Sequence, residues 1–210
     1  MTQATVQVDS EALARAMHKL VHDQTPFATA LALNDTAFDA KAALQREMER
    51  SLDRPTPFTK RGVFTARATK AKQESAVGIM PRQSEYLKFQ IKGGTRRPNR
   101  KAIPVPVNTR LNQYGNMPRR AVGRLIARPD TFIATPKAPR TAHLPPGIYQ
   151  RFGASRNGKA ARPPKLLVAF ERTADYKPIL DMHGAISKTA SLVYRKHFEK
   201  RLAHAIRTAR

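Results

Sequence analysis

The chain has 210 residues, with 39 lysines and arginines against 15 aspartates and glutamates, so its formal net charge is +24. Such an excess repels itself in a compact monomer and predicts a polyanionic partner. The absence of cysteine excludes disulfides, thiol catalysis and cysteine-ligated metal sites. No apolar run approaches the roughly 18 residues of a membrane span, and the first ten residues lack a secretion-signal pattern. We therefore expect no membrane partner.

The positive charge is concentrated in the middle of the chain. Residues 1–53 carry a net charge of −3, and the remainder carries +27. Between Tyr86 and Phe170 there are 18 basic residues and one acidic residue, Asp130, together with eleven of the sixteen prolines. Because proline disfavours helices, the two ends of the chain are compatible with helix and its middle is not. This segregation predicts one basic face or several basic arms.

Two helices are predicted before the first proline-rich connector. Ser10 is a candidate N-cap for a short amphipathic helix that ends near Asp23. Thr25 and Pro26 then supply the cap and first position of a second helix, which we expect to run from Pro26 to Ser51. Many of its residues are alanines, which let another backbone approach closely. We therefore expect this long helix to be a packing spine.

A stiff, non-helical connector is predicted over residues 53–59, because its two prolines bias the backbone to extended geometry. Residues rich in β-formers then predict the two strands of a hairpin, at 63–68 and 75–79. A short helix is expected over 85–91, and Gly93–Gly94 would end it.

The basic middle is predicted to be loops and short strands. Thr95–Lys101 is expected to be a basic loop, and Ile103–Val107, with two prolines, an edge strand or polyproline-like. Met117–Pro118 is a candidate start for a short helix. Three further strands are predicted at 131–135, 147–152 and 166–170, with a tight turn at Asn157–Gly158 between the last two.

Apolar residues return to helical spacing in the last segment, which predicts a long basic helix from Ile179 to about Thr208. The predicted fold is therefore α+β: N-terminal helices, a small antiparallel sheet with Pro-rich basic loops, and a long C-terminal helix. We expect a single domain over residues 1–210. Its parts are a helical region at 10–52, a β-rich region with basic arms at 59–172, and the helix at 179–208.

No residue pattern points to catalysis. His18 and His22 have the spacing of two metal ligands on one helix face, but Lys19 lies between them and opposes a cation. Glu47 and Glu49 lie on different helix faces beside arginines, which favours surface ion pairs over acid–base work. The sequence predicts no catalytic residue, no metal site and no cofactor. We therefore expect a protein that is not an enzyme.

Basic side chains are the strong chemical signal, and few aromatic residues accompany them. Modules that stack bases interleave aromatic and basic residues, so the pattern favours contacts with duplex phosphates over base reading. The alternative is that these side chains pair with acidic neighbours in an assembly. The residues expected to make either contact are Arg96, Arg97, Arg100, Lys101, Arg119, Arg120, Arg124 and Arg128.

Several segments together carry a family resemblance. They are the alanine-rich helix from Ala28 to Leu52, the connector Asp53-Arg54-Pro55-Thr56-Pro57-Phe58-Thr59 and the basic strand after it. Further along, Phe132-Ile133-Ala134 precedes the Asn157–Gly158 turn, and Tyr176-x-Pro178-Ile179 leads into the long basic helix. With these features the chain resembles the prophage minor tail protein Z family of lambda-like, long-tailed bacteriophages.

The resemblance implies a structural virion protein that completes the tail at its head-proximal end, in the neck region, after assembly in the host cytoplasm. The implied partners are the tail terminator, the tail tube and the head–tail connector proteins, with double-stranded DNA as a further candidate. Since a tail has rotational symmetry, copies would form a ring, expected to be a hexamer, through heterologous contacts. The apolar residues expected to pack between copies are Phe27, Leu31, Phe38, Leu44, Met48, Val193, Phe198 and Leu202.

A cellular nucleic-acid-binding protein, such as a ribosome-associated or nucleoid protein, is the alternative interpretation. It predicts tight binding of duplex or RNA by the isolated monomer, with an affinity that falls steeply with salt. The acidic first 53 residues favour the tail protein over this alternative, because a plain DNA coat has little use for a segment of charge −3.

Overall fold

The computed structural model describes residues 10–98, 101–152 and 162–208. It combines long helices with small antiparallel sheets, so the predicted α+β class is confirmed. Contacts group the chain into two compact units. Unit 1 comprises Met1–Ser51, Pro57–Glu85 and Leu180–Arg210, and unit 2 comprises Leu52–Thr56 and Tyr86–Ile179. A single domain over residues 1–210 stays a prediction.

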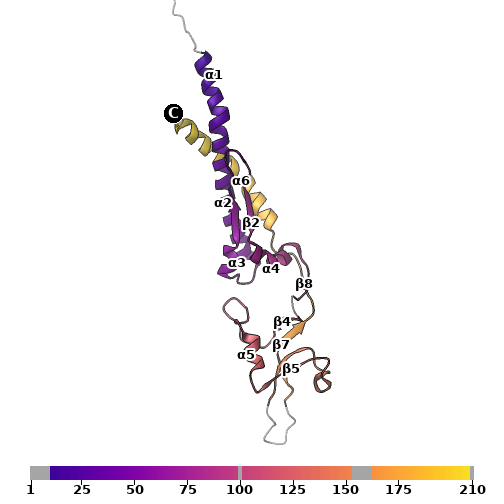
Figure 1. The fold of residues 1–210 in the computed structure, drawn as a ribbon. Helices are drawn as coiled ribbons and strands as arrows, with labels where there is room; N and C mark the ends of the chain where they lie inside the picture. The colour runs from indigo at the N-terminus through magenta and orange to yellow at the C-terminus, as the bar shows by residue number, and fades with distance from the viewer. Residues whose placement is uncertain (1–9, 99–100, 153–161, 209–210) are drawn as a thin grey trace, which may run out of the picture. The chain divides into compact units, whose positions relative to one another are not determined.

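Unit 1 begins with a continuous helical rod, α1 (Ser10–Lys19), η1 (Leu20–Gln24) and α2 (Thr25–Ser51). Figure 1 shows α1 running on into α2. The expected break near Asp23 is therefore wrong, whereas the long helix to Ser51 is confirmed. Pro26 has no amide hydrogen and its ring crowds the preceding turn. The wider π turn of η1, immediately before it, lets the chain stay helical there.

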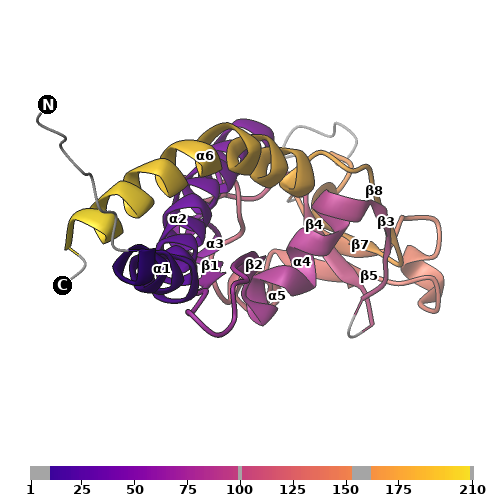
Figure 2. The same ribbon diagram turned by 90° about the horizontal axis from the view of Figure 1, so that it is seen from above.

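The second long helix of unit 1, α6 (Met182–Thr208), confirms the predicted C-terminal helix. It lies beside α2 and runs antiparallel to it (Figures 1 and 2). Asp181 caps its start, because the Asp181 Oδ1 atom accepts a 2.8 Å hydrogen bond from the Gly184 amide. A Cβ at Gly184 would come within 2.0 Å of that carboxylate, so glycine is the residue that leaves room for the cap.

The buried face of α2 is formed by every fourth residue. Its members, all at most 7 % exposed, are Ala28, Ala32, Thr36, Ala40, Leu44 and Met48. Such a row is the ridge that packs into the groove of a neighbouring helix. The buried hydroxyl of Thr36 donates to the Ala32 carbonyl oxygen at 2.8 Å, so the ridge contains no unsatisfied polar side chain. Small side chains form most of this face, as expected for a packing spine.

A hairpin of β1 (Val63–Ala66) and β2 (Ala76–Ile79) completes unit 1 and packs on α2. The hairpin is confirmed, but the expected connector is shorter, because the short helix α3 (Pro57–Arg61) occupies its last residues. Asn34 of α2 fastens the hairpin by two hydrogen bonds to Ala68, one to the carbonyl oxygen at 3.0 Å and one from the amide at 2.8 Å.

Unit 2 is built around an antiparallel sheet with strand order β4–β7–β6–β5. Its strands are β4 (Ile103–Pro106), β5 (Thr131–Ala134), β6 (Gly147–Gln150) and β7 (Lys165–Glu171), and all four confirm predicted strands. The proline-containing β4 lies at the sheet edge, where a missing amide donor costs least. A single turn, η2 (Pro139–Thr141), lies between β5 and β6. The predicted Asn157–Gly158 turn lies outside the described residues.

The core of this sheet contains Ile148, Leu167 and Val168, against which the short helix α5 (Ala121–Ile126) packs through Val122 and Leu125. The expected helix therefore begins later than Met117–Pro118. A β-bulge shifts the β6–β7 register between Ile148 and Tyr149. Beside the bulge, a Cβ at Gly147 would lie 2.5 Å from the Val168 carbonyl oxygen, so glycine is what allows the two strands to approach.

The ridge of α2 generates a stability prediction. Leu44 is fully buried, and its truncation to alanine should lower the free energy of unfolding by about 2–5 kcal/mol, because it removes contacts and leaves a cavity. Leu192→Ala on α6 is the matched control, since that side chain is 71 % exposed and its loss should change stability by at most about 0.5 kcal/mol. Chemical denaturation of both variants measures the difference. Equal losses of stability in the two variants would contradict the assignment of Leu44 to the buried face of α2.

Candidate functional site

Arg96 and Arg97 lie at a two-stranded ladder of unit 2. The helix α4 (Pro81–Lys92), longer than the predicted 85–91, ends at Gly93, whose φ of 71° is the left-handed geometry of a helix C-cap. β3 (Gly94–Arg96) follows and pairs with β8 (Ala174–Tyr176), so the expected loop after Gly94 begins as a strand. Both arginines are exposed. The ladder therefore presents two cationic side chains to solvent.

A second group of arginines surrounds α5. Arg120 precedes the helix in the left-handed conformation, with φ 65°, and Arg119 lies just before it. Arg124 extends from α5 and its Nη2 atom donates to the Arg119 carbonyl oxygen at 3.1 Å. Val122 and Leu125 anchor the other side of α5 on the sheet, and the exposed residues of this short helix include Arg124 and the apolar Ile126.

The predicted basic residues therefore form separate groups. Figures 1 and 2 draw α5 apart from the ladder of β3 and β8, and Lys101 lies exposed just before β4. Arg100 is outside the described residues. No hydrogen bond or ion pair to another described residue engages the side chains of Arg96, Arg97, Lys101, Arg119 and Arg120.

Arg128 differs from the other arginines because its charge already has a partner. Its Nε and Nη2 atoms donate to both carboxylate oxygens of Asp130, at 2.9 and 2.6 Å. The hydrogen bond from Arg128, with a second from Gln150, holds the pKa of Asp130 below its ordinary value. Arg128 thus stabilises the entry to β5, and its expected contact with an external anion stays a prediction.

Carboxylates across the described chain are mostly engaged in the same way. In unit 2, Asp53 binds Arg54, and Asp175 accepts a hydrogen bond from the Thr95 hydroxyl. The carboxylates of unit 1 that pair with bases are Glu11, Asp23, Asp35, Asp39, Glu47, Glu49, Glu74 and Glu199. Few acidic groups are therefore left to neutralise the unpaired arginines of unit 2.

The structure also brings together an aromatic and cationic stack that sequence reasoning missed. Phe132 of β5 and Tyr149 of β6 are paired across the strands, with ring centroids 5.6 Å apart, and the Arg151 guanidinium lies 4.9 Å from the Phe132 ring. Burial raises the pKa of Tyr149, whose hydroxyl donates to the Pro145 carbonyl oxygen. The feature that could have revealed the stack is the pairing of β5 with β6, whose register places Phe132 opposite Tyr149. With Tyr149 only 4 % exposed, the stack is structural.

The residues expected to pack between copies fall into three groups by burial. Leu44 and Met48 are fully buried within unit 1, so they have no surface left for a neighbouring copy, and that part of the expectation is corrected. Phe27 and Phe38 are 48 % and 69 % exposed, and they remain available. Leu31 of α2 and Val193, Phe198 and Leu202 of α6 are half-buried. Leu31 and Phe38 line a small hollow of about 290 Å³ beside β1.

A charged network joins α2 and α6 inside unit 1. The Arg201 Nε and Nη2 atoms donate to the two carboxylate oxygens of Asp35, at 2.6 and 2.9 Å. One turn along, the His197 Nε2 atom lies 2.8 Å from the Asp39 Oδ2 atom. The hydrogen bond from Arg201 holds the pKa of Asp35 below its ordinary value of 3.8. Each pair joins one residue of α2 to one residue of α6, so together the two pairs fix how the helices are aligned along their lengths.

The Asp35–Arg201 pair generates a pH prediction. Because the pKa of Asp35 is lowered in the folded chain, its stabilisation is complete above the ordinary value of 3.8 and is lost as the pH falls through the folded value. Asp35→Asn should lower the free energy of unfolding by about 1–3 kcal/mol at neutral pH. The difference from the wild type should shrink below pH 3.8.

Denaturation of both proteins at several pH values measures this difference. Asp53→Asn is the control, because the exposed Asp53–Arg54 pair should contribute less at every pH. A wild-type-to-variant difference that is the same at neutral and acidic pH would contradict the role assigned to Asp35.

The described residues contain no cluster of three or more histidine, cysteine, aspartate or glutamate side chains that could hold a metal ion. His18 and His22 contact each other, with ring centroids 4.2 Å apart. None of the described helices combines the length and apolar character needed to cross a bilayer. What the basic groups can do chemically is hold anions by charge and hydrogen bonds.

No family model matches the chain, and no curated protein or solved structure matches it either.

Proposed function

We propose that the chain is a structural virion protein of a tailed bacteriophage, a minor tail protein that completes the head-proximal end of the tail. Copies form a ring that joins the tail to the neck. Unit 2 faces an anionic surface, either the end of the packaged genome or acidic surfaces of the tail tube and head–tail connector. The proposed location in the tail rests on the resemblance of the long helices and their connectors to the minor tail protein Z family.

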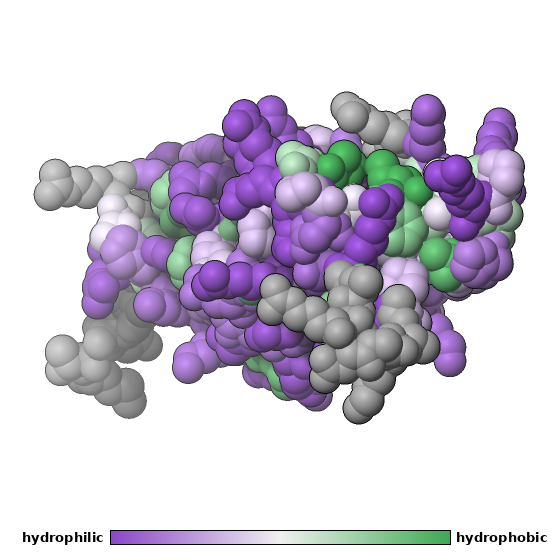
Figure 3. Space-filling model, turned by 90° about the horizontal axis from the view of Figure 1, so that it is seen from below, coloured by the Kyte–Doolittle hydropathy of each residue, from purple (hydrophilic) through white to green (hydrophobic). Residues whose placement is uncertain are grey.

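The observation that carries the proposal is the set of unpaired arginines of unit 2. Arg96, Arg97, Arg119 and Arg120 are exposed and have no ionic partner among the described residues. Neighbouring cations repel one another, and an anionic surface removes that repulsion while displacing counterions. Figure 3 shows one face of the molecule, on which hydrophilic residues predominate and apolar residues form one larger area and several smaller ones. A hydrophilic surface of this kind is better suited to docking by charge than to forming an apolar interface.

Exposed apolar side chains of unit 1 supply contacts between copies in this proposal. Phe38 on α2 and Leu192 on α6 are 69 % and 71 % exposed, and Phe27 is 48 % exposed. They lie on helices whose opposite faces are packed within the chain. A heterologous contact of one such face with a different face of the next copy closes a ring when the rotation matches the symmetry of the tail.

A triple substitution tests the contact with an anionic surface. Arg96→Ala, Arg97→Ala and Lys101→Ala together should leave the midpoint of thermal unfolding unchanged, because all three side chains are exposed and unpaired. Infectious titre of the phage that encodes the chain should fall about tenfold or more, the factor that corresponds to ~1.4 kcal/mol of lost binding. Electron micrographs should show separate heads and tails.

The matched control removes three exposed, unpaired bases of unit 1, Arg82, Lys196 and Arg207, and should leave titre near that of the wild type. Full infectivity of the unit 2 variant would contradict the proposed contact.

A salt titration of duplex binding distinguishes the tail protein from the alternative function. Nanomolar binding by the isolated chain at physiological salt would favour a cellular nucleic-acid-binding protein. Weak binding by the free chain is what the tail protein predicts.

A further inference from the structure

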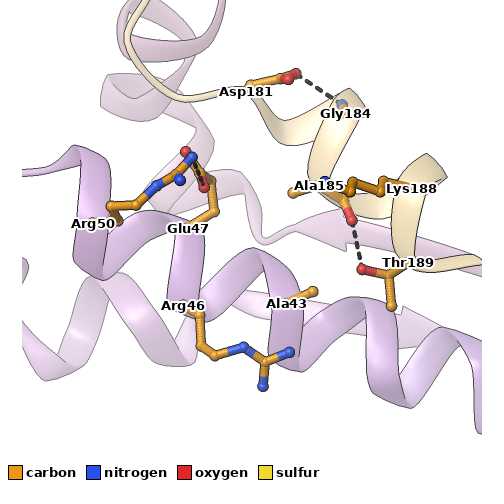
Figure 4. A pocket seen from close by; sticks show the side chains of 9 residues that line it. All are labelled: Ala43, Arg46, Glu47, Arg50, Asp181, Gly184, Ala185, Lys188 and Thr189. Carbon is orange, nitrogen blue, oxygen red and sulfur yellow. Dashed lines mark hydrogen bonds and ion pairs between the residues drawn. The ribbon is translucent and has the colours of Figure 1, made fainter. Parts of the chain in front are cut away.

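A second cationic site lies in unit 1, between α2 and α6. The two helices leave a cavity of about 560 Å³, open to solvent. Arg46 and Arg50 of α2 and Lys188 of α6 line it, and Figure 4 shows Arg50 turned onto Glu47. The residues at the base of the cavity are small, Ala43 on α2 and Gly184 and Ala185 on α6, and this is what leaves the space.

The cavity gathers three basic side chains, and of these only Arg50 has an acidic partner among the described residues, Glu47. Arg46 and Arg50 are one helical turn apart, a spacing at which like charges destabilise a helix. Neither Arg46 nor Lys188 has an ionic or hydrogen-bonding partner among the described residues. Helix packing brings Lys188 to the same cavity from the other side. An anion bound among these side chains removes the repulsion.

Two carboxylates also line the cavity, and each accepts at least one hydrogen bond within unit 1. Glu47, whose side chain is 14 % exposed, accepts a hydrogen bond from the Ser51 hydroxyl at 2.5 Å and lies 2.8 Å from the Arg50 Nη2 atom. These two contacts, that of Ser51 first, hold the pKa of Glu47 below its ordinary value, so Glu47 stays ionised and orients Arg50. Asp181 caps the Gly184 amide. The cavity side chains that have no partner among the described residues include the cations of Arg46 and Lys188.

We propose that this cavity binds a phosphate group. Guanidinium groups match the oxygen spacing of phosphate and bind it through paired hydrogen bonds, and an ammonium group binds it as a point charge. The free donors, the Arg46 guanidinium from α2 and the Lys188 ammonium from α6, arrive from two helices with Arg50 beside them, which suits a tetrahedral oxyanion better than a planar carboxylate that one guanidinium satisfies. The phosphate comes either from a small phosphorylated compound or from a nucleic-acid backbone. The proposal is independent of the tail function, since it concerns unit 1 alone.

Calorimetric titration of the full chain tests the site. The probes are inorganic phosphate, a short double-stranded oligonucleotide and a hexaglutamate peptide, each at the same ionic strength. Arg46→Gln with Lys188→Gln removes the two unpaired cations of the cavity. Arg82→Gln with Lys196→Gln is the control, because it makes the same change of charge at exposed positions of unit 1 outside the cavity. Unfolding midpoints establish that both variants are folded.

We expect the cavity variant to bind phosphate roughly a hundredfold more weakly than the wild type, since it loses two charged hydrogen bonds and each weakens binding about tenfold. The control should bind phosphate like the wild type. An equal loss in the oligonucleotide titration assigns the phosphate to nucleic acid, and a loss for inorganic phosphate alone assigns it to a small compound. Equal losses in cavity variant and control would overturn the proposal, as would a loss confined to hexaglutamate or wild-type binding by the cavity variant.

Discussion

The scarcity of carboxylates is the constraint on which the rest of the molecule depends. Fifteen acidic residues face 39 basic ones, and most described carboxylates are engaged within the unit that contains them. In unit 1 they connect elements: Asp35 holds α6, and Asp23 binds Lys70 beyond the β1 strand. In unit 2 the acids are too few for the arginines around β3 and α5. Ion pairing thus organises unit 1, whereas most of the described arginines around β3 and α5 in unit 2 have no acidic partner among the described residues.

The antiparallel packing of α2 and α6 decides which side chains of the two helices are buried, which line a cavity and which are exposed. A ridge of mostly small residues on α2 lets α6 approach, and the Asp35–Arg201 and Asp39–His197 contacts set which turns face each other. The same register brings Lys188 opposite Arg46 and Arg50. It also leaves Phe38 and Leu192 on outward faces. Packing within the chain, the cationic cavity and the surfaces available to further copies therefore follow from one helix pair.

Much of the fold could be predicted because periodicity and proline placement act locally. The long helices, the β1–β2 hairpin and the proline-containing edge strand β4 are of this kind. The buried face of α2 was harder, since the large residues Phe27 and Phe38 point outward while alanines are buried. Pairings between distant residues leave no local signal, and Asp35 and Arg201 are 166 positions apart. Residue type identified the cationic candidates, but the structure shows that Arg128 is already paired and that Arg46, Arg50 and Lys188 share a cavity.

The most direct measurement is cryo-electron microscopy of the virions in which we propose that the chain is a tail component. The claim under test is that the arginines of unit 2 are neutralised by a surface outside the chain, in an assembled tail. The account predicts a ring of copies at the head-proximal end of the tail, with Arg96, Arg97, Arg119 and Arg120 against DNA phosphates or carboxylates of neighbouring proteins. Particles that lack the chain, or a ring in which these side chains face bulk solvent, would contradict it.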